Sequence, residues 1–484
     1  MEEVDIAAIK KRSIRGVFAL VSRTFVIQIV GFVVNFLLTI FLSPSVFGIF
    51  FVVSAVIAFF SYFSDIGLAA ALIQKKEPIT NDDLKTTFTI QQILVIFLVI
   101  IAFIFSNAVS SFYSLEKEGT LLFQALVIAF FLSSLKTIPS IILERNLQFQ
   151  KLVIPQIVET LLFNITVLIL AIKGYGVSSF TYAVLVRGVS GLLVIYIIAP
   201  WRIRIGFSKD VAKKLLSFGI PFQTNSILAL MKDDLLTIFL GKILPIAQVG
   251  FIGFAQKWAF YPLRLIMDNV IRITFPSFSR LQHDKNLLGL AIEKSLFVSS
   301  FFIFPSLTGF AILFPYFINL IPKYEKWEPA VLSLSFFAIN AGLSSISTPL
   351  TNALNAIGKI KVTLYLMVFW TVATWIMTPL FIYFYGFNGV AIASAIISFS
   401  VVGVVYLAKK YINFDIFKVT SGPFVAALFM SVIIYFLSPM IIKNLFTFLL
   451  MIVIGAILYF GAVFFLTKRQ ILANIALVRE NIKK

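Results

Sequence analysis

The chain has 484 residues, of which 60% are hydrophobic and only 13% are charged. A water-soluble protein of this length cannot bury so much apolar surface. It contains no cysteine and a single histidine, His283, which excludes a disulfide framework, a thiolate nucleophile and a Cys/His metal cage. The net charge of +19 falls in short basic clusters between long apolar runs, so it indicates membrane orientation and not a nucleic-acid partner. Neither a metal nor a cofactor is expected.

Apolar runs bounded by charged residues, proline or glycine predict an all-α membrane protein with fourteen membrane-spanning helices. In chain order these spans cover residues 14–42, 46–72, 84–112, 119–143, 152–172, 177–199, 211–241, 246–278, 288–320, 329–355, 360–383, 387–408, 420–438 and 444–466. Several are longer than the roughly 20 residues that a bilayer requires, which predicts tilts, kinks or helical extensions. The first run is too long for the core of a cleavable signal peptide.

The charges between the runs predict the orientation. Segments on one side of the membrane carry 27 Lys and Arg, whereas the opposite side carries six, namely Lys117, Lys173, Lys242, Lys323, Lys326 and Lys443. Because basic loops remain in the cytoplasm, both termini are predicted to be cytoplasmic, in the cytoplasmic (inner) membrane. The loops on the outer side are all short, so the activity is expected to lie within the membrane.

Two weak echoes indicate an internal repeat. Residues 37–42 and 235–240 both read Leu-Leu-Thr-Ile-Phe-Leu, and Phe/Gly-rich stretches follow at 46–50 and 249–254. Tyr175-Gly176 and Tyr385-Gly386 form the second echo, and the offsets of 198 and 210 residues both match a six-span unit. We therefore predict two six-helix lobes of the same orientation, residues 1–205 and 206–418, with a cavity between them. Residues 419–484 would then supply two additional helices and a tail. Chance recurrence of an apolar hexapeptide is the alternative.

Seven basic residues lie within or near the predicted spans: Arg23, Lys136, Arg187, Lys232, Lys257, Arg264 and Arg272. Facing lipid would cost about 3 kcal/mol for each of them, so most must reach the interface, form pairs or face water. Snorkelling or packing between helices would account for Lys136 and Arg187.

The eighth span concentrates charge on one face. Lys257, Arg264, Asp268 and Arg272 fall within an arc of roughly 80° at helical spacing. Such a face cannot contact lipid, so it predicts the wall of a polar cavity. The alternative is that Asp268 only braces the two arginines within the helix.

Further charged residues lie in three other spans. Span one adds Arg23, span seven adds Lys232, Asp233 and Asp234, and Glu159 lies well inside span five. Guanidinium and ammonium groups favour an anionic substrate, since arginine offers a planar fork that matches phosphate oxygens.

These charges give the following assignment of the site. The predicted substrate-binding residues are Arg23, Lys232, Lys257, Arg264 and Arg272, and the predicted coupling or charge-pairing residues are Asp234, Asp268 and Glu159. The coupling cation would be a proton or sodium. Glu159 suits a structural hydrogen-bonding role equally well.

Four short segments resemble the polysaccharide transporter branch of the MOP exporter superfamily, which contains O-antigen and exopolysaccharide flippases. The segments are Phe63-Ser64-Asp65-Ile66-Gly67-Leu68 with Leu72-Ile73-Gln74-Lys75-Lys76, Ile138-Pro139 through Leu143-Glu144-Arg145-Asn146-Leu147-Gln148-Phe149, Phe275-Pro276-Ser277-Phe278-Ser279-Arg280-Leu281-Gln282, and Leu354-Asn355-Ala356-Ile357-Gly358-Lys359. The resemblance spans residues 15–410. It implies a MATE-like fold whose two lobes alternate in access and move an undecaprenyl-diphosphate-linked oligosaccharide across the membrane for cell-surface polysaccharide synthesis, with membrane lipid as a further partner.

Two other classes of function remain open at this stage. A multidrug or metabolite antiporter of the same superfamily would prefer an acidic or aromatic cavity, whereas the charges here are mainly basic. An integral-membrane enzyme would need a carboxylate-rich catalytic loop or a large outer loop, and the sequence contains neither, so no enzymatic activity is expected.

The charge distribution generates a test of topology. Reporter fusions after residues 117, 242 and 443 should report an external location, and fusions after 76, 209, 285 and 484 an internal one, because the basic loops remain in the cytoplasm. Paired phosphatase and fluorescent-protein reporters measure this directly. Two or more inverted reporters would contradict the fourteen-span layout.

Overall fold

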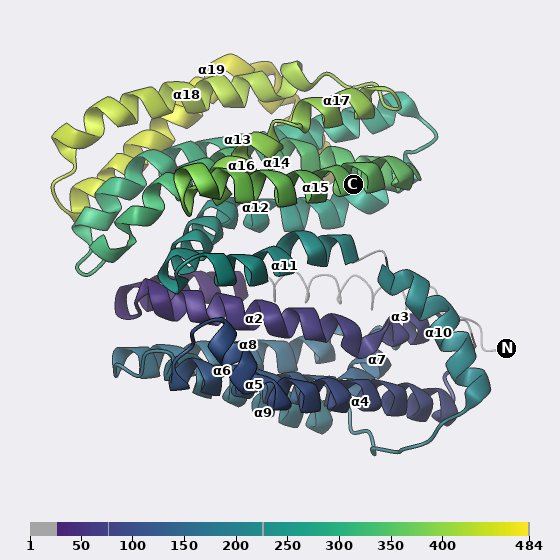
Figure 1. Ribbon diagram of the computed structural model, residues 1–484. Coiled ribbons are helices and arrows are strands. Elements are labelled where there is room, and N and C mark those ends of the chain that lie inside the picture. Colours follow the sequence, from purple (N-terminus) through teal and green to yellow (C-terminus); the bar gives the residue numbers. More distant parts are fainter. Residues whose placement is uncertain (1–26, 76, 225–226, 483–484) are drawn as a thin grey trace. The chain divides into compact units, whose positions relative to one another are not determined.

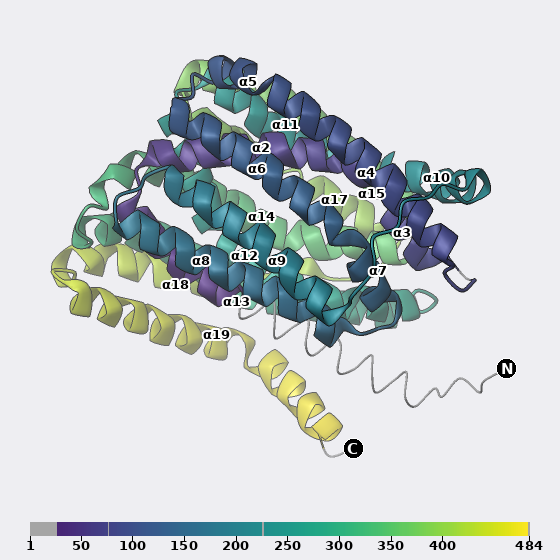
Figure 2. The ribbon, with the colours of Figure 1, turned by 90° about the horizontal axis from the view of Figure 1, so that it is seen from below.

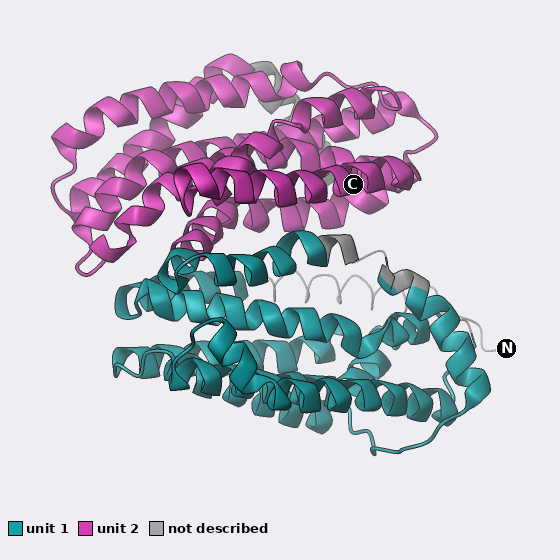
Figure 3. Ribbon diagram, in the orientation of Figure 1, with its two compact units in different colours: residues 1–250 teal, residues 251–484 magenta. Residues whose placement is uncertain are grey.

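The computed structural model describes residues 27–75, 77–224 and 227–482, and its regular elements in these ranges are all helical. Contacts between residues divide the chain into two compact units, residues 1–250 and 251–484, shown in teal and magenta in Figure 3. The predicted lobes, 1–205 and 206–418, rest on the sequence repeat, whereas the boundaries of these two units rest on contacts. The lobes stay a prediction, as does the separate terminal region 419–484.

The first unit is built from a series of helices that follow one another along the chain (Figure 1). An apolar helix, Ile27–Phe41, comes first among the described residues. It is followed by α2 (Pro44–Asp65), α3 (Leu68–Gln74), α4 (Asn81–Ile104), α5 (Ser106–Phe112), α6 (Lys117–Leu135), α7 (Thr137–Arg145), α8 (Phe149–Ile172), α9 (Ser178–Ile198), α10 (Lys209–Thr224) and α11 (Ile227–Ile243). The first residues of α12 (Ile246–Arg280) also belong to this unit.

The second unit contains the rest of α12 and the remaining helices. These are α13 (Lys285–Leu320), a 3-10 turn at Glu325–Ala330, α14 (Val331–Ala356), α15 (Ile360–Tyr385), α16 (Asn388–Ser398), α17 (Val401–Lys409), α18 (Ile416–Ile441) and α19 (Leu445–Ile482). Two apolar clusters hold the unit together, one between α13, α14 and α17 and the other between α13, α18 and α19. The Tyr459 hydroxyl of α19 fixes the second cluster by donating to the Phe301 carbonyl at 2.7 Å.

The fold class predicted from the sequence is confirmed. Eleven of the described helical segments are long and apolar enough to cross a membrane. Three other predicted spans coincide with the helix Ile27–Phe41, with α10 and α11, and with α12. These three are not among the eleven because the described part of the first is short, α11 has only 17 residues, and α12 carries charges. Helices suit these segments because a bilayer offers no water to backbone N–H and C=O groups.

Several predicted spans are divided into two helices, and the clearest break lies between α2 and α3. Ile66 has φ of 47° and Gly67 has φ of 74°, so two successive residues adopt the left-handed conformation. Glycine tolerates this conformation, but a β-branched residue is strained there, at a cost of about 1–3 kcal/mol. The Asp65 carboxylate offsets part of this strain by accepting the Ala69 N–H at 3.1 Å at the start of α3.

One arginine connects α7 to the end of α3. The Arg145 guanidinium donates to the carbonyl oxygens of Leu72 and Lys75, both at 2.7 Å, and to that of Glu77. These carbonyls lie where α3 ends, so they lack helical partners of their own. The loop that follows is held from its other side by Asp83, which caps α4 together with Thr80 and accepts from Lys75 at 2.6 Å.

In the first unit, α2 occupies a central position. It packs against α4 and α6 on one side and against α11 on another, and α8 and α9 pack closely together next to α6 (Figure 2). The helix α10 contacts α3 and α4. Helices α10 and α11, which belong to the predicted second lobe, therefore lie against α2, α3 and α4.

We expect Arg145→Ala to lower the free energy of unfolding by about 2–4 kcal/mol, because three carbonyls would lose a charge-assisted donor. Arg145→Lys should retain part of this stability, since one ammonium cannot reach three carbonyls in the same geometry. Thermal unfolding of the detergent-solubilised protein measures the loss. Lys151→Ala, an exposed position two residues into α8, is the matched control and should change stability by less than about 0.5 kcal/mol. Equal effects of Arg145→Ala and Lys151→Ala would contradict the assignment.

Candidate functional site

Helix α12 has two contrasting faces. One face is apolar and packs within the second unit: Phe254 stacks on Trp327 with ring centroids 4.1 Å apart, and Trp258 stacks on Phe310 at 5.8 Å. Met267 continues this face and accepts a hydrogen bond from the buried Ser299 hydroxyl at 3.2 Å. Aromatic stacking and area burial together fix the rotation of the helix about its axis.

The opposite face of α12 carries the predicted charges. Lys257, Arg264, Asp268 and Arg272 are all exposed, whereas Leu263 and Met267 between them are buried. Lys257 and Arg264 lie close enough for their charges to interact. In the described part of the chain no ion pair joins Asp268 to Arg264. The brace that the sequence offers as an alternative is therefore not formed at Arg264.

Helix α11 carries the charged residues of predicted span seven. Lys232 pairs with its neighbour Asp233, with Nζ 3.0 Å from Oδ1, and the Asp233 side chain is 66% exposed. An exposed pair of this kind contributes little stability. Asp234 is half-buried on the same helix. Arg23, the other predicted substrate-binding residue, lies outside the described residues.

Glu159 lies in a buried ion pair that the sequence did not indicate. Lys136, at the junction of α6 and α7, places its Nζ 2.6 Å from Glu159 Oε2, and the two side chains are only 18% and 11% exposed. Gly191 of α9 faces the pair, and a Cβ on this glycine would overlap Glu159 Oε2. The pair explains how both charges are tolerated within apolar spans. Charge pairing, one of the two roles predicted for Glu159, is therefore what the geometry favours.

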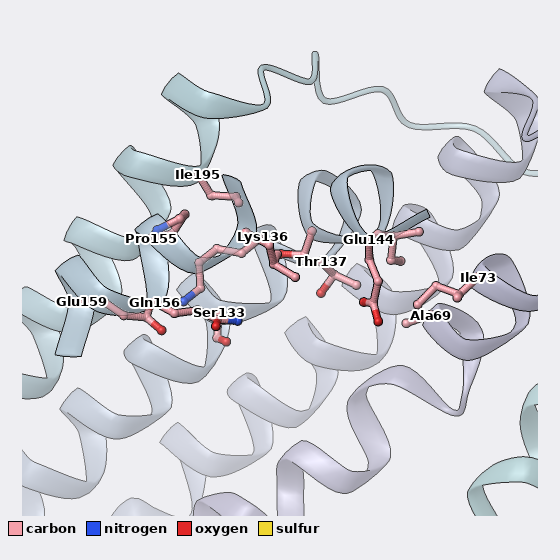
Figure 4. A pocket seen from close by; sticks show the side chains of 13 residues that line it. Ala69, Ile73, Ser133, Lys136, Thr137, Glu144, Pro155, Gln156, Glu159 and Ile195 are labelled. Carbon is pink, nitrogen blue, oxygen red and sulfur yellow. Dashed lines mark hydrogen bonds and ion pairs between the residues drawn. The ribbon is translucent and has the colours of Figure 1, made fainter. Parts of the chain in front are cut away.

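A cavity of about 320 Å³ with both polar and apolar lining adjoins this pair, between α3, α6, α7, α8 and α9. Figure 4 shows Lys136, Glu159, Gln156 and Ser133 gathered at one end, and Glu144 with Ala69 and Ile73 at the other. Hydroxyl, amide and carboxylate groups line the space between the two ends. The cavity can hold water or a small polar group, which would further stabilise the buried charges.

Two features of the first unit were missed by sequence reasoning, and each has a physical cause. Lys136 was expected to snorkel or pack between helices, but its partner lies one span away and only tertiary packing brings the two together. The need for glycine at position 191 comes from a side chain on another helix. The only sequence signal was the coincidence of one cation and one carboxylate inside neighbouring apolar runs.

In the described ranges, no three His, Cys, Asp or Glu side chains gather closely enough to hold an ion. The exposed guanidinium and ammonium groups of α12 can bind an anion. Binding at such a face needs no covalent step.

The fold and the charges within it define a polytopic helical membrane protein of the transporter type. The chain belongs to the polysaccharide biosynthesis protein family, whose model matches residues 37–332, more than half of the sequence. The resemblance stated from the four sequence segments is thereby confirmed.

Known proteins agree with this assignment. The lipopolysaccharide biosynthesis protein WzxC of Escherichia coli (strain K12) is 24% identical over 373 residues, which cover 75% of this chain and 74% of WzxC. Among solved structures, the lipid II flippase MurJ in an inward closed conformation matches with a TM-score of 0.75 at 18% identity, covering 93% of this chain and 99% of MurJ. An inward-facing multidrug resistance MATE family transporter of the MOP superfamily has a TM-score of 0.61 at 17% identity, covering 81% and 97%. The chain therefore has the MOP fold.

The buried pair generates a stability prediction. Lys136→Met or Glu159→Met alone should lower the free energy of unfolding by about 3 kcal/mol, because each leaves one buried charge without a partner. The double variant should recover most of this loss, since no charge then remains. Thermal unfolding of the four proteins gives the coupling as a double-mutant cycle.

The exposed pair Lys85 and Asp82, at 3.4 Å, is the matched control. Its cycle should give a coupling below about 1 kcal/mol. Additive losses at Lys136 and Glu159 would show that the two side chains act independently.

Proposed function

We propose that this protein is a flippase that moves an undecaprenyl-diphosphate-linked oligosaccharide from the cytoplasmic to the outer leaflet of the cytoplasmic membrane. The observation that supports this proposal most strongly is the exposed charged face of α12. The other face of this helix is packed, and the charged face carries Lys257, Arg264, Asp268 and Arg272. Exposed charges at this depth need a water-filled cavity. Membership of the polysaccharide biosynthesis family supplies the class of substrate.

The diphosphate is the part of such a substrate that this face suits best. Arg264 and Arg272 each offer a planar fork for phosphate oxygens, and Lys257 adds a point charge next to Arg264. Arg23 and Lys232 are proposed to assist from spans one and seven. The glycan would then be shielded in the aqueous cavity while the lipid chain remains in the bilayer.

Transport by this route needs no chemistry on the substrate. The two predicted lobes would rock about the repeat axis and change the side to which the cavity opens, with both termini in the cytoplasm. Coupling to a proton or to sodium is proposed to involve Asp234 and Asp268, since the buried pair with Lys136 occupies Glu159. WzxC and MurJ carry names consistent with this role, as a lipopolysaccharide biosynthesis protein and a lipid II flippase.

An antiporter of cationic drugs is the alternative that shares the fold. Recognition of a cation would call for carboxylates or aromatic rings on the exposed face. The three basic residues on the exposed face of α12 outnumber its one carboxylate, Asp268, which favours an anion instead.

Purified protein in liposomes tests the proposal. A lipid-diphosphate oligosaccharide should reach the opposite leaflet, where a membrane-impermeant sugar-modifying enzyme detects it. Arg264→Ala and Arg272→Ala should each lower the rate at least tenfold with normal membrane abundance, because each removes a bidentate phosphate contact. Arg264→Lys should retain part of the rate, since an ammonium cannot make this contact.

Arg280→Ala is the matched control, at the exposed end of the same helix and outside the charged face. It should transport at the parental rate. No protein-dependent translocation across a panel of such lipids, together with drug efflux in cells, would favour the antiporter. Parental rates in both alanine variants would leave the charged face without a role in binding.

A further inference from the structure

The start of α2 crosses the start of α12 at two glycines. A Cβ on Gly48 would overlap the carbonyl oxygen of Ile246, and a Cβ on Gly250 would overlap that of Pro44. The contact is reciprocal. Pro44 lies four residues before Gly48 and Ile246 lies four residues before Gly250, so each helix presents a carbonyl at the same relative position to the glycine of the other helix. A two-fold axis between two helices produces such reciprocity. The two glycines also lie in the Phe/Gly-rich stretches that follow the repeated hexapeptide, so each repeat contributes one of them.

Span seven continues this contact at the same end of α2. A Cβ on Gly241 would lie 2.6 Å from Val52 Cγ2, so α11 and α2 approach closely there. We call the contacts Gly48 with Gly250 and Val52 with Gly241 the outer clasp, because the predicted topology places them at the external side. Lys242 strengthens it by donating to the Phe112 carbonyl at 3.0 Å.

A second close contact lies at the other end of α2. A Cβ on Gly219 of α10 would meet backbone atoms of Ile66 and Gly67, and a Cβ on Gly67 would overlap Gly219. Beside them, the Tyr62 hydroxyl donates to the Gln223 carbonyl at 2.6 Å and the Gln223 amide donates to the Tyr62 carbonyl at 2.7 Å. We call these contacts the inner clasp.

The two clasps are separated by about the thickness of a membrane. Gly48 and Gly67 are 19 residues apart, which corresponds to roughly 28 Å along a helix, close to the ~30 Å hydrocarbon core. At Gly48 with Gly250 and at Gly67 with Gly219, backbone lies against backbone with no side chain interlocked. Such surfaces can separate without the rotamer changes and voids that opening a packed core requires.

We infer that the inner and outer clasps are the two gates of the transport cycle, which open in alternation. This inference rests on the proposed function and assigns the moving contacts within it. Opening to the cytoplasm parts α10 from the turn at Ile66 and Gly67, where water replaces the hydrogen bonds of Tyr62 and Gln223. Opening to the outside parts α11 and α12 from α2. Both clasps are closed in this structure.

The strained turn at Ile66 and Gly67 forms part of the inner clasp. Ile66 holds a left-handed conformation that disfavours β-branched residues, and the turn brings the backbone of Gly67 against Gly219. Strain that persists in a fold is commonly retained for function. The segment Ser64-Asp65-Ile66-Gly67, which carried part of the family resemblance, thus has a mechanical explanation in the inner clasp.

The absence of cysteine makes the test direct, because introduced pairs have no background. Tyr62→Cys with Gln223→Cys reports the inner clasp, and Val52→Cys with Gly241→Cys the outer clasp. A short bifunctional methanethiosulfonate should cross-link each pair and lower transport of a lipid-diphosphate oligosaccharide in liposomes at least tenfold. Reduction should restore it.

Gln92→Cys with Ser134→Cys is the matched control. These side chains are hydrogen bonded at 3.1 Å between α4 and α6, within one predicted lobe. Cross-linking there should leave the transport rate unchanged. Parental transport with either clasp cross-linked, or failure of the clasp pairs to cross-link, would overturn the inference while leaving the proposed function intact.

A second measurement needs no transport. Gly219→Ala should hold the inner clasp open, because the added methyl group overlaps the facing backbone. The inner cysteine pair should then cross-link severalfold less, while the yield at the outer pair is unchanged. Gly48→Ala should lower the yield at the outer pair and leave the inner pair unchanged. Gly31→Ala is the control, because nothing lies within 4 Å of a Cβ there. Equal losses at both pairs with either variant would contradict independent gates. If the parent moves no lipid in liposomes, the proposed function fails, and these yields still decide whether the clasps open separately.

Discussion

A charge inside a hydrocarbon layer must have a partner or water, and this constraint organises both units of the protein. In the first unit the solution is pairing, since Lys136 and Glu159 neutralise each other across neighbouring helices beside a polar cavity. In the second unit the solution is exposure, since α12 turns its aromatic side inward and leaves Lys257, Arg264 and Arg272 uncovered. The proposed function assigns the substrate to the exposed set of charges and leaves the buried pair to the fold.

Exposure on α12 depends on the packing of its other face. Phe254 and Trp258 stack on rings of the same unit, so the helix cannot rotate its charges inward without losing these contacts. The apolar face therefore positions the basic face. In the proposed function, an anion would meet a basic face whose helix is already fixed in rotation, which lowers the entropy cost of binding.

Glycine has a comparable importance for motion. Lipid gives helices no hydrophobic drive to associate, so close approach through small residues supplies much of the attraction. Two close approaches of this kind, at Gly48 with Gly250 and at Gly67 with Gly219, lie at opposite ends of the same span. The contacts that stabilise the structure at these points are also those that can separate with little rearrangement of side chains.

The sequence by itself determined the class of the protein. Long apolar runs and the basic segments between them predicted an all-helical membrane protein, because a bilayer imposes both features on the residues directly. Helical spacing also predicted that Lys257, Arg264, Asp268 and Arg272 share one face, since a period of 3.6 residues is a local property. The four segments that resemble the family could be recognised in the sequence, but the sequence did not show what structural role their residues have.

Tertiary structure alone decided which charges and glycines meet. The partner of Glu159, the three carbonyls bound by Arg145 and the approach of Gly67 to Gly219 all join residues that are distant in the sequence. No local rule gives such pairings, because they depend on the order and tilt in which helices pack. The left-handed turn at Ile66 has local support from Asp65, but its contact with Gly219 comes only from the fold.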